Sequence, residues 1–182
     1  MSDPISAQNG ASFEGFAAIR EIGPIGMITL RAKAGTKGLD KAVKAATGCG
    51  LPAMLRIEVQ GDRAAGWMSP DELLLIVPYD GVEKALTAIA AALKGQHHLA
   101  VNVSDARAVF RVEGAKADQV MRKISPVDFD ALTPGELRRT RAAQVAAAFW
   151  RDEAGFTVVC FRSVAGYVMA LLSQSAQPGS EL

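Results

Sequence analysis

The sequence contains few of the residues from which catalytic and metal sites are usually built. Its 182 residues include only two cysteines and two histidines, and aromatic residues make up 6% of the chain. Two cysteines cannot form a disulfide framework, so a reducing compartment, the cytoplasm, is expected. The chain has no apolar run near the roughly 20 residues that a membrane-spanning helix needs. Its polar start, Met1 to Gly10, lacks the cationic and apolar segments of a signal peptide.

The sequence also lacks an excess of charge of either sign. Lys and Arg number 20, Asp and Glu number 19, and the formal net charge is +1. Nucleic acids and acidic membrane surfaces attract proteins that carry a clear excess of Lys and Arg. The sequence therefore predicts neither nucleic acid nor a membrane as a partner.

The common nucleotide, metal and hydrolase motifs are missing as well. There is no G-x-G-x-x-G, P-loop, H-E-x-x-H, C-x-x-C or G-x-S-x-G. His97 and His98 are adjacent, so in a strand they would point to opposite faces and could not share a metal ion. Cys49 lies at an expected helix end and Cys160 in an apolar strand, where a small core residue is expected. We therefore expect no catalytic, cofactor-binding or metal-binding residue in this chain.

What the sequence does contain is the composition of a globular protein. Hydrophobic residues make up 49% of the chain and charged residues 21%. A chain of this length can bury about 70% of its unfolded surface, so it needs neither disulfides nor metal to fold. It suits one domain, or two small ones that share a core.

The pattern of apolar residues predicts alternating strands and helices. In the first part, a helix carries Leu39, Val43 and Ala46 on one face, and Met54 to Gln60 forms a strand with Leu55, Ile57 and Val59 on one face. Gly61-Asp62 fits a two-residue turn into a partner strand, Arg63 to Met68. The complete set of expected elements in this part is strands at 25–32, 54–60, 63–68, 73–77 and 99–103, and helices at 39–46 and 82–93.

The second part repeats this order in a shorter form. It is expected to contain a strand at 108–112, a helix from about Ala115, a hairpin of Arg141–Trp150 with Phe156–Arg162, and a last helix. The fold class is thus α+β, with two related split β-α-β (ferredoxin-like) halves, the second truncated, and helices packed on mainly antiparallel sheets. The expected boundaries are a flexible N-terminus at 1–14, halves at 15–105 and 106–174, and a flexible C-terminus at 175–182.

Two clusters of polar residues are candidates for function. In the first, Asp71 and Glu72 could form a carboxylate pair beside Trp67. A turn position would leave both carboxylates solvated, with nothing to raise their pKa, so a structural turn is favoured, with Trp67 at a sheet edge.

The second cluster contains four arginines close to two aromatic residues: Arg138, Arg139, Arg141 and Arg151, with Phe149 and Trp150. Such a cluster could bind phosphate, a folate carboxylate, an acidic partner or single-stranded RNA. Nearby acidic residues would neutralise much of its field. A solvated face and a protein-partner surface both remain open, and we take Arg138, Arg139 and Arg141 as the candidate partner interface.

Five segments of the chain resemble the gamma subunit family of heterotetrameric sarcosine oxidase. They occur in the order and with the spacing of that family, over about Ile25 to Leu172. The W-x-x-P-D-E hairpin is shared with the T-protein of glycine cleavage and other folate-binding relatives. The five segments are Trp67–Leu75, Val103–Arg107 (V-S-D-x-R), Ser125–Asp128, Arg139–Val145 (R-T-R-x-x-Q-V) and Phe161–Ser163 (F-R-S).

The resemblance implies a subunit that is not itself catalytic, in a complex with alpha, beta and delta chains. That complex oxidises sarcosine to glycine, yields formaldehyde or methylene-tetrahydrofolate, and makes hydrogen peroxide. FAD, FMN, NAD, folate and zinc are implied only in the partner subunits. The alternatives are a stand-alone folate-dependent aminomethyltransferase-like protein and an anion-binding module that uses the Arg cluster. The first of these is disfavoured because such enzymes are about twice as long.

Overall fold

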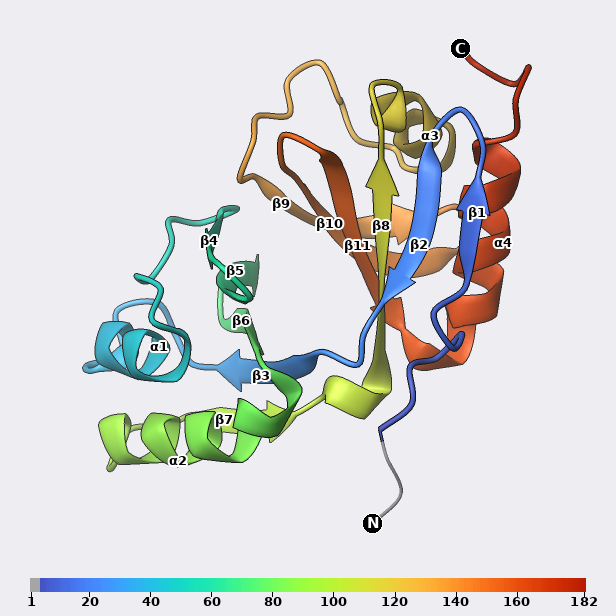
Figure 1. The fold of residues 1–182 in the computed structure, drawn as a ribbon. Helices are drawn as coiled ribbons and strands as arrows, with labels where there is room; N and C mark the ends of the chain where they lie inside the picture. Colours follow the sequence, from blue (N-terminus) through green and yellow to red (C-terminus); the bar gives the residue numbers. More distant parts are fainter. Residues whose placement is uncertain (1–3) are drawn as a thin grey trace. The chain divides into compact units, whose positions relative to one another are not determined.

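The computed structural model describes residues 4–182, and the chain divides into two compact units. Ile25–Ser104 forms one of them, here called the continuous unit. The residues up to Pro24 combine with Asp105–Leu182 to form the other, here called the split unit. Each unit has an antiparallel sheet with α-helices packed on it (Figure 1). The change from one unit to the next near residue 104 lies at the V-S-D-x-R segment.

The continuous unit has a five-stranded sheet in the order β4-β5-β6-β3-β7, and every neighbouring pair is antiparallel. Without the edge strand β4, this is the split β-α-β arrangement that the sequence predicts. The pairing of β4 with β5 confirms the predicted hairpin. The elements are β3 (Gly26–Arg31), α1 (Leu39–Thr47), β4 (Ile57–Gln60), β5 (Arg63–Ser69), β6 (Glu72–Val77), a 3-10 turn (Tyr79–Gly81), α2 (Val82–Ala92) and β7 (Leu99–Asn102).

Helix α1 shows how the sequence specifies this unit. The predicted stripe of Leu39, Val43 and Ala46 is buried in the core between the helices and the sheet. The helix ends at Gly48, whose φ of 79° is the left-handed conformation that glycine adopts without a steric penalty. The N–H of Gly48 donates to the carbonyl of Lys44 and satisfies one of the last carbonyls of the helix.

The strand expected at Met54–Gln60 is shorter than predicted. It begins at Ile57, because Leu55 has a φ of 62° and cannot continue a strand. Ile57 and Val59 share one face of β4 as predicted, and only Leu55 lies outside the strand, but of these two only Ile57 is buried, since Val59 is 58% exposed. The physical reason is that β4 is the edge strand of its sheet and is covered along only part of its length.

The split unit has a six-stranded antiparallel sheet in the order β1-β2-β8-β11-β10-β9. Helices α3 and α4 contribute apolar side chains to one core with this sheet. The elements are β1 (Ser12–Glu14), β2 (Ala18–Ile22), a 3-10 turn (Ser104–Ala106), β8 (Arg107–Glu113), α3 (Ala117–Ile124), β9 (Leu137–Ala142), β10 (Val145–Arg151), β11 (Gly155–Phe161), a 3-10 turn (Arg162–Val164) and α4 (Ala165–Ser175).

Apart from the additional edge strand β1, the two sheets have corresponding strand orders, and β2 completes the half that looked truncated. In the continuous unit, β7 follows α2 and pairs with β3. In the split unit no strand follows α4 among the described residues, and β2 pairs with β8 in the equivalent position. The fourth strand of the second half therefore comes from the N-terminal segment. The expected half at 15–105 differs from the observed units at this point, because residues 15–24 group with the split unit.

The long strand expected at Arg141–Trp150 is instead a hairpin. Strand β9 ends at Ala142, β10 begins at Val145, and these two residues pair across a two-residue turn. Ala143 in the turn has a φ of 47°. Alternation of side chains cannot reveal such a turn when neither central residue is Gly, Asn or Asp. The second predicted hairpin, between β10 and β11, is confirmed.

Both segments that we expected to be flexible make defined contacts in the structure. Within residues 4–14, β1 pairs with β2, and the N–H groups of Gln8 and Gly10 donate to the buried carboxylate of Glu21. At the C-terminus, the N–H of Leu182 donates to the side-chain carbonyl of Gln119. The first three residues of the expected N-terminal segment lie outside the described part of the chain.

Candidate partner interface

Strand β9 displays the arginines that the sequence singles out as a candidate interface. Arg139 and Arg141 alternate on one face of the strand, and both side chains are exposed. They lie opposite Ala148 and Ala146 of β10, whose short side chains do not cover a guanidinium group. Within residues 4–182, neither arginine has an acidic side chain in ion-pair distance.

Arg138 points to the other face of β9 and is in a different environment. Its Nη2 lies 3.3 Å from the Oε1 of Glu136. Its Nη1 is buried and finds no hydrogen-bond partner among the described residues. The three predicted interface arginines are therefore adjacent in the chain, but only Arg139 and Arg141 present unpaired positive charge on a common face.

A cavity of about 330 Å³ lies at the Arg141 end of β9, between the end of α3 and the β9–β10 turn. Its polar lining includes Lys123, Arg141 and Gln144. The Nζ of Lys123 already donates to the carbonyl of Ser175 and to Ser180. Ser125 also lines the cavity, and its hydroxyl oxygen is buried without a hydrogen-bond partner in the described chain. Arg141 thus supplies the uncommitted charge of this cavity.

The structure separates the aromatic residues of this cluster from the exposed arginines. Phe149 is in the core, stacked on Phe129 with ring centroids 5.6 Å apart. Trp150 is also buried, and the guanidinium carbon of Arg151 lies 5.9 Å from the ring centre of Phe156. Neither ring of the cluster is free to stack on a nucleic-acid base, so the structure offers no combined Arg–aromatic surface here.

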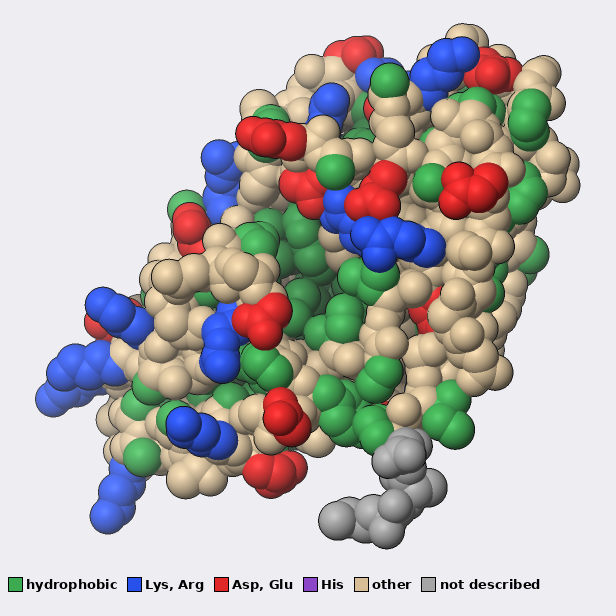
Figure 2. Space-filling view, viewed as in Figure 1, with side chains coloured by type: hydrophobic (Ala, Val, Ile, Leu, Met, Phe, Trp, Pro, Cys, Tyr) green, Lys and Arg blue, Asp and Glu red, His purple; other side chains and the backbone are tan. Residues whose placement is uncertain are grey.

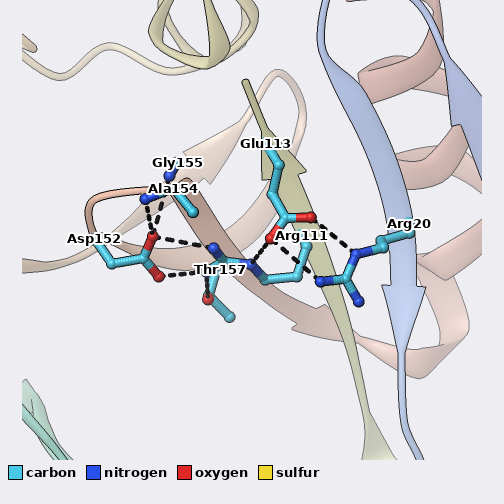
Figure 3. Close-up of polar contacts among 7 residues, drawn as sticks. All are labelled: Arg20, Arg111, Glu113, Asp152, Ala154, Gly155 and Thr157. Atoms are coloured by element: carbon cyan, nitrogen blue, oxygen red, sulfur yellow. Dashed lines mark hydrogen bonds and ion pairs between the residues drawn. The ribbon is translucent and has the colours of Figure 1, made fainter. Parts of the chain in front are cut away.

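A second group of charged residues is almost fully paired and was not predicted from the sequence. Arg111 is only 8% exposed, and it binds Asp152 through two hydrogen bonds of 2.5 and 3.0 Å (Figure 3). It also donates to the hydroxyl of Thr157 and to Glu113, which accepts from Arg20 as well. Figure 2 shows acidic and basic side chains side by side over β8 and β2. The sequence signal was the i, i+2 spacing of Arg111 and Glu113, which places both on one face of a strand.

The pKa shifts in this group indicate a structural role. Burial alone would raise the pKa of Asp152, but Arg111 and the N–H groups of Ala154 and Gly155 hold its pKa below the usual value. Hydrogen bonding from Arg20 lowers the pKa of Glu113 in the same way. Carboxylates with lowered pKa values stay ionised at neutral pH, so neither can act as a general acid there.

The turn cluster around Trp67 also has a structural role, although its details differ from the prediction. Glu72 is buried and pairs with Arg31 at 2.7 Å, so it is not a solvated turn carboxylate. Asp71 is exposed and accepts from the hydroxyl of Ser69. Trp67 lies in the core of the continuous unit, with its indole N–H donating to the carbonyl of Pro52. The expected sheet-edge position of Trp67 is therefore wrong.

The remaining candidates do not form a reactive site. His97 and His98 lie between α2 and β7, and His98 contacts the backbone carbonyl of Gln96. Cys49 and Cys160 are both buried. Burial raises the pKa of the Cys160 thiol to about 12, which disfavours the thiolate. Within residues 4–182, no three His, Cys, Asp or Glu side chains come together as metal ligands, and no helix is long and apolar enough to cross a membrane.

Comparison with known proteins shows which family the chain comes from. The family model described as "Sarcosine oxidase, gamma subunit family" matches residues 31–177. The sarcosine oxidase subunit gamma of Corynebacterium sp. (strain U-96) is 34% identical over 156 residues, which cover 80% of this chain and 73% of that protein. The chain belongs to the sarcosine oxidase gamma subunit family.

Two solved structures also match the chain. A chain of heterotetrameric sarcosine oxidase from Corynebacterium sp. U-96, in complex with pyrrole 2-carboxylate, matches with a TM-score of 0.79 at 27% identity. The match covers 91% of this chain and 87% of that one. Aminomethyltransferase T of the glycine cleavage system from Bartonella henselae matches with a TM-score of 0.64 at 10% identity. That match covers 87% of this chain and 46% of the transferase, and it shows likeness of fold alone.

The segments that resemble the gamma family make structural contacts in this member. At the change from one unit to the other, the buried hydroxyl of Ser104 accepts from the N–H of Met27 at 2.9 Å. In the F-R-S segment, Phe161 lies under the guanidinium of Arg107, at 4.2 Å from its carbon to the ring centre. Arg162 donates to the backbone carbonyl of Ile5. These motif residues hold turns and termini in place, while Arg139 and Arg141 of the R-T-R segment remain exposed.

Proposed function

We propose that this chain is a non-catalytic gamma subunit that helps to assemble a sarcosine oxidase complex. Family membership supports the subunit role, and the 0.79 match to a chain from a heterotetrameric sarcosine oxidase supports assembly with other chains. The partners in this proposal are alpha, beta and delta subunits. The complex would convert sarcosine to glycine, with formaldehyde or methylene-tetrahydrofolate and hydrogen peroxide as the other products.

The sites described above support a proposal in which the chemistry belongs to the partner chains. The buried ionic group is committed to internal pairs, and the two cysteines are buried. In this proposal FAD, FMN, NAD, folate and zinc belong to the partner subunits, and the gamma chain contributes binding surface. The observation that carries the proposed contact is the exposed, unpaired pair Arg139 and Arg141 on β9.

The charges of Arg139 and Arg141 predict how this contact should depend on the partner's charge and on salt. Two like charges on alternate positions of one strand repel each other, and an acidic surface on a partner chain would relieve that repulsion. Bidentate pairs between guanidinium and carboxylate would add directional hydrogen bonds. Because exposed charges are screened by salt, the contribution to assembly should be largest at low ionic strength.

Replacement of Arg139 and Arg141 together by Ala tests the interface. We expect the double variant to bind the partner chains about 10-fold or more weakly at low salt, and to depend less on salt than the unmodified chain. Binding can be measured by titration against the complex of alpha, beta and delta chains at two salt concentrations.

A matched control removes two positive charges elsewhere. Lys41 and Lys44 are exposed residues of α1, and their replacement by Ala changes the net charge by the same amount. The control should bind like the unmodified chain. Equal binding by all three proteins at both salt concentrations would rule out a contact through the guanidinium groups of Arg139 and Arg141.

A further inference from the structure

Strand β9 is an open edge of the split unit's sheet. The opposite edge of the same sheet is closed by β1, which pairs with β2. On the β9 side no further strand follows among the described residues, and Figure 1 shows β9 at the end of the sheet. An open edge presents backbone N–H and C=O groups that can pair with another chain.

The register of the β9–β10 hairpin identifies which backbone groups face that edge. Ala142 and Val145 flank the two-residue turn and form the pair that bonds across it. Pairs alternate in an antiparallel ladder, so Thr140 and Arg138 also direct their N–H and C=O groups toward β10. Arg139 and Arg141 therefore direct theirs toward the open edge. Leu137, opposite Trp150, faces the same way, so the two arginines with unpaired guanidinium groups are among the three β9 residues whose backbone groups face the open edge.

The open stretch is short and has a defined end. Beyond Arg141, the N–H of Ala143 donates to the carbonyl of Ile124, so the segment after α3 closes the edge at the turn. The 330 Å³ cavity, lined by Arg141 and Ser125 among others, lies at this end. The open edge thus runs over Leu137–Arg141, a length of about 17 Å. That is the length of an ordinary single strand.

Charge determines which strand fits the edge. Two copies of β9 paired with each other would bring arginines of the two chains together, and like charges opposite one another destabilise a sheet. A strand with carboxylates on alternate residues would instead place one beside Arg139 and one beside Arg141. The arginines thus disfavour self-association and favour an acidic partner.

We propose that β9 accepts an extended segment of a partner subunit as an added strand, with an acidic-x-acidic pattern facing Arg139 and Arg141. This inference rests on the proposed assembly function, and it specifies how one contact is made. The backbone bonds of the added strand provide binding, and the two carboxylates select the segment.

Hydrogen exchange of single amides tests this arrangement directly. The full-length chain is compared alone and in the complex with alpha, beta and delta chains, with residue-level resolution. We expect the amides of Arg139 and Arg141 to exchange rapidly in the free chain and at least tenfold more slowly in the complex. The amides of Arg138 and Thr140 bond to β10 and should be slow in both states, which provides an internal control.

The outcomes separate this inference from the proposed function. If no complex forms, the proposed function fails. If the complex forms while the amides of Arg139 and Arg141 still exchange rapidly, strand addition is wrong although assembly is right.

A pair of variants at one position gives a second test. Arg139→Ala removes the charge, and Arg139→Pro also removes the N–H that faces the open edge, at a position where a strand tolerates proline. After both variants are shown to melt at similar temperatures, we expect Arg139→Pro to bind the partner chains about 2–10-fold more weakly than Arg139→Ala. Equal affinities would contradict a backbone contact at this residue.

Discussion

Arg111 is the most buried arginine of the described chain, and its charge is stabilised by neighbours from two other segments. Asp152 and Glu113 accept its hydrogen bonds, and Thr157 supplies a further acceptor. A buried guanidinium that loses a hydrogen-bond acceptor destabilises the folded protein, because its charge is left unsatisfied. Asp152 is itself 43% exposed at its side chain, so solvent screens part of this interaction.

Replacement of Asp152 by Asn should lower the free energy of unfolding by about 1–2 kcal/mol at pH 7, because Arg111 loses its bidentate partner. The measurement is urea unfolding followed by circular dichroism. Asp130→Asn is the control. Because Asp130 is highly exposed, loss of its charge beside Arg122 should lower the free energy of unfolding much less. Equal losses of unfolding free energy in the two variants would show that the burial of Arg111 does not strengthen its pairing with Asp152.

The same variant tests a dependence on pH. The pKa of Asp152 is lower in the folded protein than in the unfolded chain, where it is about 3.9. Its contribution to stability is therefore complete at neutral pH and is lost as the pH falls below about 5 toward the folded-state pKa. Unfolding measured between pH 7 and pH 3 should show a smaller loss of stability for Asp152→Asn than for the unmodified protein.

At the residue scale, the sequence predicted the exposed face of β9 better than it predicted which charged side chains pair with each other. The alternation of Arg139 and Arg141 on one face follows from the strand period, and β9 confirms it. The pairing of Arg111 with Asp152 could not be predicted, because it joins residues 41 positions apart through the register of three strands. Glu72 was misplaced for a similar reason, since its partner Arg31 lies on a strand distant in sequence.

At the scale of secondary-structure elements, β2 is the part that completes the split unit. Ile19 of β2 is fully buried and pairs with Val112 of β8. If β2 is an integral strand, Ile19→Ala should lower the free energy of unfolding by about 2–4 kcal/mol through lost burial and the cavity that remains. Val101→Ala on β7 is the control, because Val101 is exposed and should lose less than about 1 kcal/mol. A small effect for Ile19→Ala would show that the N-terminal segment is dispensable.

The β9–β10 turn offers a stabilising substitution. Ala143 has a φ of 47° and Gln144 does not have a positive φ, which matches a type II′ turn, whose first central position favours Gly. Ala143→Gly should raise the free energy of unfolding by about 0.5–1 kcal/mol, because relief of strain exceeds the entropy cost of glycine. Ala142→Gly, one residue earlier in the strand, should destabilise instead. Thermal unfolding of both variants checks the opposite signs.

Helices and hairpins with clear local signals were predicted well, and elements that depend on distant partners were not. Gly48 marked the end of α1, and Gly61-Asp62 marked the β4–β5 turn. The N-terminal strands carry no such signal, because β1 and β2 are short and β2 pairs with a strand about 90 residues later. The turn at Ala143 was hidden because it lacks glycine.

At the scale of the whole molecule, the chain has a repeated architecture. Apart from the additional edge strand β1, both sheets have corresponding strand orders, and their buried charged groups Glu72 and Arg111 are engaged in internal ion pairs. The sequence allowed the family and the fold class to be predicted, because the five segments occur in family order. It could not reveal that the free backbone edge and the unpaired arginines coincide, since this depends on strand register.

The central claim is that the chain works as a subunit of a sarcosine oxidase complex, and co-expression with alpha, beta and delta chains tests it most directly. Size-exclusion chromatography with native mass measurement gives the composition of the purified species. We predict one complex that contains this chain in equal amount with each partner, and in which flavin absorbance and zinc occur with the complex and are absent from the chain purified alone. Partner chains that assemble fully without this chain, while it elutes separately, would contradict the account.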